Sequence, residues 1–573
     1  MAAQHAPVAI YFDEDGFLET SEQTAAQGEK IGGPMGRHVA GKSFLTAYLR
    51  LSQVPEFYAL ARNSVHAKAL VNLSHQARAD LPIRKLYVLL EKGFHDIFFR
   101  QCPVSTIHYP APLEGRMAWA RQYGGPHAFG LSGITHTICT QAATNSMTQW
   151  VTAPYESYDR MVCISRAAVT TVRAVTSNWA DYLADRFGGK PQMRLKLVHI
   201  PLGVDVQKFR PPSEEERTAQ RSKFGIEPDE VVVLYLGRLL HYGKVQPFPM
   251  FHGLSAVAKS TGKRIRLILA GWAPSEIVDR AFREGARAFA PGVRVDIMDG
   301  TLPEVREHAW WCADIFSFPT DNLQETFPQS VIEAMACGLP VVAARWDGCK
   351  DQVIDGETGF LIPTYMLNGA TIETTSKLLV GEYTYPHFMA RCSQAAVVDL
   401  PAIAAAFEKL VMDPALRRRM GAAGRRRAEQ EYAWEKIIPQ YEQMWDDQNQ
   451  ERQAFVRENE GSPARKFAAP SPYPGPEISF PDYPTEFIES DVGVRSTPDA
   501  ADRLGGLLKH TLTDYGRNWR CSDPARLRPL IQSASAGTTI ADLVRQLTSQ
   551  KIGKTEAQAA VMWMLKYGLL ERK

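Results

Sequence analysis

The fold is decided by the stretch Asp321-Asn-Leu-Gln-Glu-Thr-Phe-Pro-Gln-Ser-Val-Ile-Glu-Ala-Met-Ala-Cys-Gly-Leu-Pro-Val-Val-Ala-Ala344. Pro328 suits the first position of a helix, where a missing N–H costs nothing, and residues 330–337 are compatible with a helix. Gly338 suits the C-terminal cap, and Pro340 opens a short apolar strand. The stretch therefore predicts a short helix whose start faces a crevice beside a strand.

Two carboxylates, Glu325 and Glu333, lie eight positions apart in this stretch, the first in a loop and the second inside the helix. A helix start offers free N–H groups and partial positive charge, which suit a phosphate. A carboxylate just outside it can hold sugar hydroxyls, and one inside it can hold a ribose diol. The alternative is two acidic residues that only favour a helix N-terminus. The stretch resembles the E-x7-E element of family-4 retaining glycosyltransferases, which use a nucleotide sugar as donor.

Composition is that of a soluble globular protein, with 45% hydrophobic and 22% charged residues. The net charge of +2 is too small to imply a nucleic-acid or membrane partner. We find no secretory signal and no apolar run near the ~18–20 residues that span a bilayer. The eight cysteines lack a C-x-x-C pair. We therefore expect reduced thiols, a cytoplasmic location and no zinc site.

Short apolar runs alternate with helical stretches, which predicts α/β domains with parallel sheets. The strand candidates are Val8–Phe12, Gly133–Thr137, Met161–Ile164, Val231–Leu236, Ile265–Ala270, Val293–Ile297, Ile315–Phe318 and Val341–Ala343. Two facing doubly wound domains would leave a cleft for a nucleotide between them.

A second element, Val231–Lys244, carries Gly237 and Arg238 at the carboxyl end of a predicted strand. An Arg fork and a Lys point charge that converge at a strand end suit a diphosphate, although two surface cations are the plainer reading. The element resembles the Gly-Arg-Leu…Lys motif of the same family, whose cations neutralise the departing nucleoside diphosphate. Lys244 lies six residues after Arg238, where the family more often has five.

A third element is Gly133-Ile-Thr-His-Thr137, which places His136 at the end of a predicted strand. It resembles the strand-end His of the family, whose contact with the donor sugar helps to organise the transition state. A strand-end His that only bonds to nearby backbone is the alternative.

A fourth element, Gly36–Ser43, fits the Walker A pattern G-x-x-x-x-G-K-S and would make the chain a P-loop ATPase that uses Lys42. No strand precedes Gly36, however, and a helix is predicted to begin by residue 37 or 38. The segment instead resembles the Gly-Gly loop and first helix of the family, in which either Gly33 or Gly36 approaches the donor.

The pair Asp13 and Asp15 forms an Asp-x-Asp sequence, which could hold a divalent metal. The set of Glu325, Arg238 and Lys244 makes a metal unnecessary, so we expect no metal and no cofactor besides the co-substrate.

The joint resemblance covers roughly residues 8–445 and implies the GT-B architecture of two facing Rossmann-like domains. With the C-terminal extension, the predicted segments are residues 1–205 (acceptor domain), 206–430 (nucleotide-sugar domain), 431–447 (a helix crossing back to the first domain), 448–500 (a Pro-rich arm) and 501–573 (a small helical, winged-helix-like domain).

The resemblance also implies roles for individual residues. Arg238 and Lys244 would stabilise the diphosphate, helped by the turn at Thr326 and Phe327. Glu325 would hold donor hydroxyls and Glu333 the ribose, and His136 would orient the sugar. Catalysis of this kind is mainly electrostatic.

The expected partners are a UDP- or GDP-linked sugar and a glycan, lipid-linked or protein acceptor. We expect no nucleic acid and no transmembrane segment, and peripheral membrane contact and self-association stay open. The aromatic- and cation-rich segment Ile83–Arg121 is a candidate for acceptor binding.

The arm between Pro463 and Pro498 holds eight prolines and several aromatics, including Tyr473, Phe480 and Tyr483. We expect it to pack along the body, with a free tether as the alternative. In the last segment, Ile540–Leu547 and Glu556–Leu565 are predicted helices before a Gly-Leu-Leu hairpin start. A modest excess of Lys and Arg there leaves a nucleic-acid-binding or protein-binding regulator as the rival class.

Overall fold

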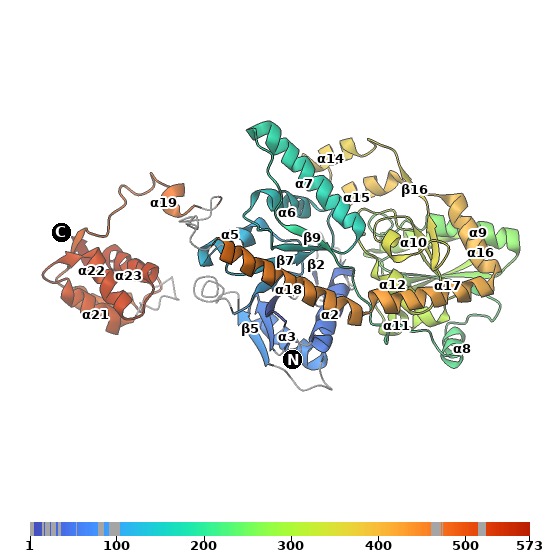
Figure 1. Cartoon of the computed structure of the whole chain (residues 1–573), viewed down its shortest axis with the longest axis horizontal. Helices are drawn as coiled ribbons and strands as arrows, with labels where there is room; N and C mark the ends of the chain where they lie inside the picture. Colours follow the sequence, from blue (N-terminus) through green and yellow to red (C-terminus); the bar gives the residue numbers. More distant parts are fainter. Residues whose placement is uncertain are drawn as a thin grey trace. The chain divides into compact units, whose positions relative to one another are not determined.

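The protein is described by a computed structural model that forms two compact units, Met1–Pro470 and Ser471–Lys573 (Figure 1). The residues described are 5–13, 17, 23–24, 30–31, 36–52, 54, 56–77, 85–90, 103–125, 127–459, 472, 474–513 and 523–573. In this part of the chain, no helix combines the length and apolar character needed to cross a bilayer.

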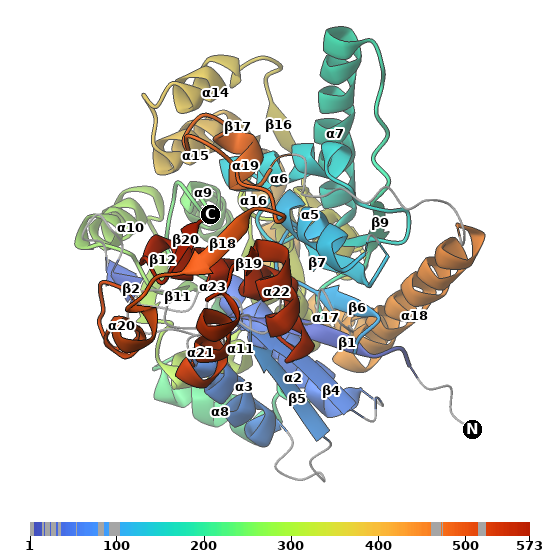
Figure 2. The ribbon, with the colours of Figure 1, turned by 90° about the vertical axis from the view of Figure 1, so that its left-hand side faces the viewer.

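The first Rossmann-like domain is built on a seven-stranded parallel sheet with the order β5-β4-β1-β6-β7-β8-β9. Its strands are β1 (Val8–Phe12), β4 (Glu56–Ala61), β5 (Lys85–Leu90), β6 (Thr106–His108), β7 (Gly130–Ile134), β8 (Arg160–Cys163) and β9 (Lys196–His199). The helices are α2 (Gly36–Leu51), α3 (Ser64–Ala77), α5 (Gly115–Gly124), α6 (Gln141–Thr152) and α7 (Arg166–Phe187). Helix α7, which follows β8 in the chain, projects beyond the edge of the sheet (Figures 1 and 2).

The strand predictions for this domain are confirmed for Val8–Phe12 and, within one residue, for β8. The prediction of Gly133–Thr137 is wrong, because β7 ends at Ile134 and begins at Gly130. The run Gly-Leu-Ser-Gly lacks the β-branched pattern of a buried strand. Its small residues are required by packing, because a Cβ on Gly130 would lie 2.4 Å from the Gln448 side chain.

The second Rossmann-like domain has a six-stranded parallel sheet with the order β12-β11-β10-β13-β14-β15. Its strands are β10 (Val231–Leu236), β11 (Ile265–Gly271), β12 (Val293–Asp299), β13 (Ile315–Phe318), β14 (Val341–Ala344) and β15 (Gly359–Ile362). All five predicted strands here are confirmed to within two residues. Val232 to Tyr235 are fully buried, as expected of a parallel strand covered on both faces.

The helices of this domain include α8 (Glu214–Lys223), α9 (Phe248–Thr261), α10 (Glu276–Phe289), α11 (Pro303–Cys312), α12 (Gln329–Ala336), α13 (Cys349–Gln352), α16 (Leu400–Met412) and α17 (Pro414–Arg427). Between β15 and α16 lies a further subdomain of β16 (Thr364–Met366), α14 (Ile372–Leu379), α15 (Tyr385–Gln394) and β17 (Ala396–Val398), in which β16 and β17 pair antiparallel.

The P-loop alternative is wrong, because Gly36–Ser43 forms the first two turns of α2 and not a phosphate-binding loop. Ser43 is engaged elsewhere, since its hydroxyl accepts a hydrogen bond from the Trp434 indole N–H at 2.8 Å.

Helix α18 (Trp434–Glu458) returns to the first domain after the second domain is complete (Figure 1). Its Glu451 carboxylate receives Arg160 at 2.6 Å and Lys196 at 2.7 Å. The Gln448 amide donates to the carbonyl of Leu131 at 3.0 Å. The helix therefore holds the two domains together and runs about ten residues beyond the predicted segment.

The second unit has a three-stranded antiparallel sheet with the order β19-β18-β20. Its elements are α19 (Pro476–Ser479), β18 (Gly493–Ser496), α20 (Ala500–Leu507), α21 (Pro524–Ser533), β19 (Thr538–Thr539), α22 (Ile540–Ser549), α23 (Lys554–Lys566) and β20 (Leu570–Arg572). Both predicted helices are confirmed. The predicted hairpin start is wrong, because Leu570–Arg572 pairs with the distant β18.

In the arm, Phe480 and Tyr483 contact each other, with ring centroids 4.8 Å apart, and both are exposed, Tyr483 by 81%. Within their own unit both side chains are therefore exposed, and the expectation that the arm packs along the first unit stays a prediction. Tyr473 lies outside the described residues.

Candidate active site

The stretch Asp321–Ala344 joins β13 to β14 and includes α12, as the sequence predicts. Pro328 is the residue before the helix rather than its first residue, and no side chain within the described residues caps the first turn. The Val331 N–H donates to the Pro328 carbonyl at 3.1 Å, so the N–H groups of Gln329 and Ser330 are the ones that can meet a ligand. Gly338 adopts φ +77°, a left-handed conformation that ends the helix.

The loop before α12 is tied to the loop that follows β10. The Thr320 hydroxyl donates to the Lys244 carbonyl at 2.8 Å, and the Asn322 amide donates to the Tyr242 carbonyl at 2.9 Å. These bonds bring the two predicted donor elements together at the carboxyl ends of β10 and β13. This edge of a parallel sheet is where ligands bind in doubly wound domains.

Lys244 and Glu325 form an ion pair at this edge, between the Lys Nζ and the Glu Oε2. Glu325 is buried, with 8% of its surface exposed, and Lys244 lies over the Phe318 ring, 5.3 Å from its centroid. The six-residue spacing from Arg238 therefore does not remove Lys244 from the site.

Arg238 follows β10 and is half-buried. Its backbone is held by the Tyr235 hydroxyl, which donates to the Arg238 carbonyl at 3.0 Å. Burial lowers the pKa of the guanidinium from its usual value, although Tyr235, Tyr242, Tyr385 and Glu325 act in the opposite direction. Among the described residues, no hydrogen bond or ion pair engages the guanidinium. Its N–H donors can therefore bind a ligand beside the Lys244–Glu325 pair.

Thr326 and Phe327 follow Glu325 and are buried, with exposures of 3% and 5%. The Thr326 hydroxyl is buried with no hydrogen-bond partner in the described part of the chain. Gly348 packs so closely on this turn that a Cβ would lie 2.6 Å from the Thr326 carbonyl oxygen.

Glu333 lies inside α12 and is 8% exposed. Burial raises the pKa of its carboxyl to about 7, against the opposing effect of Lys208 and Arg306. A carboxyl that titrates near neutrality and has no ion pair among the described residues is typical of a ligand-binding position.

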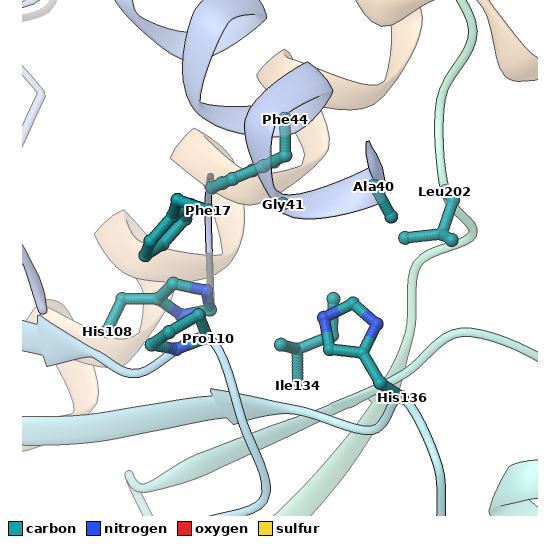
Figure 3. A pocket seen from close by; sticks show the side chains of 9 residues that line it. All are labelled: Phe17, Ala40, Gly41, Phe44, His108, Pro110, Ile134, His136 and Leu202. Atoms are coloured by element: carbon teal, nitrogen blue, oxygen red, sulfur yellow. The ribbon is translucent and has the colours of Figure 1, made fainter. Parts of the chain in front are cut away.

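His136 lies two residues beyond β7 and lines a small pocket of the first domain. Figure 3 shows its imidazole turned toward this pocket, across from His108 and Pro110. His108 is fully buried, and burial lowers its pKa to about 3, with His136 adding to the shift. Its Nδ1 lies 2.9 Å from the Ser132 hydroxyl, so His108 is a neutral packing residue. Gly33 lies outside the described residues.

Among the described residues, the Asp13 carboxylate lies 3.2 Å from Arg62 and 3.6 Å from the His66 imidazole. Asp15 lies outside the described residues. In the described segments, no three His, Cys, Asp or Glu side chains are grouped so as to hold a metal ion.

The segment proposed for acceptor binding contains a structural ion pair. Arg121 is fully buried and forms a bidentate contact with Asp159 at 2.7 and 2.8 Å. Arg121 cannot contact an acceptor from this position, so that part of the expectation is wrong.

Sequence reasoning missed the residues of the first domain that contact the second domain. The Ser165 hydroxyl lies 3.0 Å from the Asp347 carboxylate, and the Arg166 N–H donates to Asp351 at 2.7 Å. The Cys139 thiol lies 3.1 Å from the Tyr385 hydroxyl. No motif marks these residues, because each contact joins segments far apart in the chain.

Comparison with known proteins agrees with the geometry. Residues 230–379 match the family model described as glycosyl transferases group 1, which confirms the resemblance over that stretch. The chain is 26% identical over 295 residues to a D-inositol 3-phosphate glycosyltransferase of Rhodococcus erythropolis, covering 50% of this chain and 62% of the relative. It is 31% identical over 267 residues to the protein of that name from Mycobacteroides abscessus, covering 46% and 55%.

The matched regions thus span less than two thirds of these curated relatives. Among solved structures, a glycosyltransferase from Rickettsia africae superposes with a TM-score of 0.50 at 11% identity, covering 78% of this chain and 99% of that one. Identity this low shows a shared fold. The two-domain architecture is the GT-B fold.

Proposed function

We propose that the protein is a retaining glycosyltransferase, which moves a sugar from a nucleoside diphosphate to an acceptor hydroxyl. The observation that carries the proposal is the cationic edge of the second sheet. There the Arg238 guanidinium, which makes no ion pair with any described residue, lies at the same edge as the Lys244–Glu325 pair and the start of α12, which no side chain of its N-cap residue caps.

The diphosphate of the donor fits this arrangement. Arg238 presents a planar fork and Lys244 a compact ammonium group, and both stabilise the negative charge that develops as the sugar leaves. The first N–H groups of α12 add partial positive charge. Pro328 removes one N–H from the turn, so the contribution of the backbone begins at Gln329.

Glu325 serves the sugar and Glu333 the ribose. Lys244 pairs with Glu325, and a bound diphosphate would share the Lys ammonium group with that carboxylate. The Glu325 oxygens then accept hydrogen bonds from sugar hydroxyls. Glu333, buried within α12, accepts from the ribose diol.

The step is a front-face displacement at the anomeric carbon. The bond from this carbon to the diphosphate oxygen breaks, and the bond to the acceptor oxygen forms on the same face. The departing phosphate oxygen takes the acceptor proton. Because this chemistry passes through an oxocarbenium-like state, the protein acts mainly by positioning and by charge. His136 orients the sugar from the first domain.

A resident metal has no task in this scheme, because Arg238 and Lys244 neutralise the diphosphate. We expect activity to persist in EDTA. Activity that EDTA abolishes and Mn²⁺ restores would contradict this part of the proposal. Asp13 would then again be a candidate metal ligand.

The direct test is a screen of UDP- and GDP-linked sugars for binding and for slow hydrolysis of the donor, which needs no acceptor. We expect one donor class to release its nucleoside diphosphate. NMR of the freshly released sugar should show the anomeric configuration of the donor. Absence of both binding and hydrolysis across the screen would refute the proposal.

A further inference from the structure

The loop after β14 contains a carboxyl group that the proposed mechanism does not use. Asp347 adopts φ +39°, a conformation that is uncommon for non-glycine residues and that clusters at functional sites. The residues on either side of Asp347 hold the loop against the Asn322–Thr326 segment. The Trp346 indole N–H donates to the Asn322 carbonyl at 3.1 Å, and Gly348 packs on the Thr326 carbonyl. Asp347 is therefore held in place beside Glu325 and Thr326.

The first domain reaches the same carboxyl group. The Ser165 hydroxyl accepts the Ala168 N–H at 3.0 Å as the N-cap of α7, which leaves its own proton for Asp347 Oδ1 at 3.0 Å. One Asp347 oxygen thus accepts a hydrogen bond from the opposite domain. The second oxygen has no hydrogen bond within the described residues.

The charges around Asp347 favour its neutral form. Burial, chiefly, raises the pKa of the carboxyl to about 8, and Glu325 and Asp351 raise it further, whereas the Ser165 hydrogen bond and Lys350 lower it. The Asp347 charge in turn contributes to the raised pKa values of the Cys139 and Cys349 thiols, which burial chiefly causes. No ion pair to Asp347 occurs in the described part of the chain. The neutral form that this environment favours can present its proton from the oxygen that Ser165 leaves free.

We propose that Asp347 is a further substrate-binding residue of this site and holds a hydroxyl group of the sugar being transferred. The inference rests on the proposed function, because it needs a nucleotide sugar in the crevice. A neutral carboxyl both donates and accepts, which matches a sugar hydroxyl. An ionised carboxyl would repel both Glu325 and a bound diphosphate. The neighbouring Glu325 serves other hydroxyls of the same sugar.

The test compares the affinities of two ligands by calorimetry: the nucleotide sugar found in the donor screen and its nucleoside diphosphate. The variants are Asp347→Ala, Asp347→Asn and the matched control Asp355→Asn, whose carboxylate is exposed and paired with Arg345 at 2.6 Å. We expect Asp347→Ala to weaken binding of the nucleotide sugar about three- to tenfold, the scale of one hydrogen bond. Affinity for the nucleoside diphosphate should stay within twofold.

The pH dependence gives a second readout. As pH rises through about 8, wild-type Asp347 ionises and loses its donor, so affinity for the nucleotide sugar should fall. The side chain of Asp347→Asn keeps an N–H donor at every pH, so its affinity should not fall with this profile. Glu333 titrates in both proteins, so its effect cancels in the ratio of the wild-type affinity to the Asp347→Asn affinity at each pH.

Two results would overturn the inference alone, while the wild type still binds its donor. One is a nucleotide-sugar affinity for Asp347→Ala equal to that of the wild type. The other is an equal loss for nucleotide sugar and nucleoside diphosphate, which would assign Asp347 a purely structural role. A wild type that binds no nucleoside diphosphate overturns the inference and the proposed function together.

Discussion

Lys244 and Glu325, which are 81 residues apart in the chain, form an ion pair in the crevice of the second domain. One comes from the loop after β10 and the other from the loop after β13, two strands that are neighbours in the sheet. The pair is a product of topology: parallel strands bring their carboxyl ends, and the loops that follow, to one edge.

The first prediction concerns this pair. Glu325→Gln keeps the size of the side chain but removes the charge that holds Lys244, and it weakens the grip on sugar hydroxyls. We expect donor turnover to fall by one to two orders of magnitude, with nucleoside diphosphate still bound, because Lys244 is released toward the phosphate. Turnover like that of the wild type, measured by release of nucleoside diphosphate, would remove Glu325 from its assigned role.

The second prediction uses the raised pKa of Glu333. Because this carboxyl titrates near 7 in the folded chain and near 4.5 when exposed, the neutral form is favoured by folding. Its contribution to stability is complete below about pH 4.5 and is lost as pH rises through about 7. Glu333→Gln does not titrate. We therefore expect the variant to match the wild type near pH 4.5 and to exceed it by ~2–4 kcal/mol at pH 8.

Denaturant unfolding of both proteins across this pH range measures the difference. A stability difference that is constant with pH would show that Glu333 is not titrating as described. Nucleoside diphosphate binding should weaken in the variant, because an amide accepts fewer hydrogen bonds from a ribose diol than a carboxylate.

The third prediction separates structure from acceptor binding in the first domain. Arg121→Ala leaves the Asp159 carboxylate buried and without its bidentate partner. Removing one partner of a buried pair costs about 3–5 kcal/mol. We expect this loss in the free energy of unfolding, whereas Arg116→Ala, which removes an exposed cation from the same helix, should be nearly neutral. Equal stability of the two variants would contradict the structural role of Arg121.

The fourth prediction concerns the second unit. Residues 471–573 have a core of their own, built from residues such as Val494, Leu527, Leu543 and Val561. Deletion of this unit should leave hydrolysis of the donor within threefold of the full chain, because every proposed donor contact lies in the first unit. Deletion from residue 451 onward should damage the protein, since Glu451 anchors α18 to Arg160 and Lys196. Equal behaviour of the two truncations would contradict the role given to α18.

Much of the fold was predictable from the sequence, because a parallel strand covered on both faces is written as a continuous apolar run. Val231–Leu236 has that form, and Ile315–Phe318 is interrupted only by the buried Ser317; both match their strands residue for residue. Strand β7 does not, because Gly130 and Ser132 pack against α18, and a Cβ on Gly133 would lie 2.7 Å from the Ala111 carbonyl oxygen. Small residues in a strand resemble a loop sequence when the helix that they pack against lies more than 300 residues away in the chain.

The site divides in the same way. Arg238, Lys244, Glu325 and Glu333 lie within local motifs, so spacing alone indicated them. Asp347 was not predictable, because its character depends on Ser165, 182 residues away, and on burial that only the folded chain creates.

The measurement that tests the central claim most directly is the rate of donor hydrolysis for Arg238→Ala beside Arg283→Ala, an exposed arginine paired with Asp279 on α10. Loss of the Arg238 guanidinium should cost ~2–4 kcal/mol of transition-state stabilisation, a fall in rate of about 30- to 1,000-fold. Arg283→Ala should match the wild type. A rate for Arg238→Ala within threefold of wild type would contradict the claim that this crevice stabilises a departing nucleoside diphosphate.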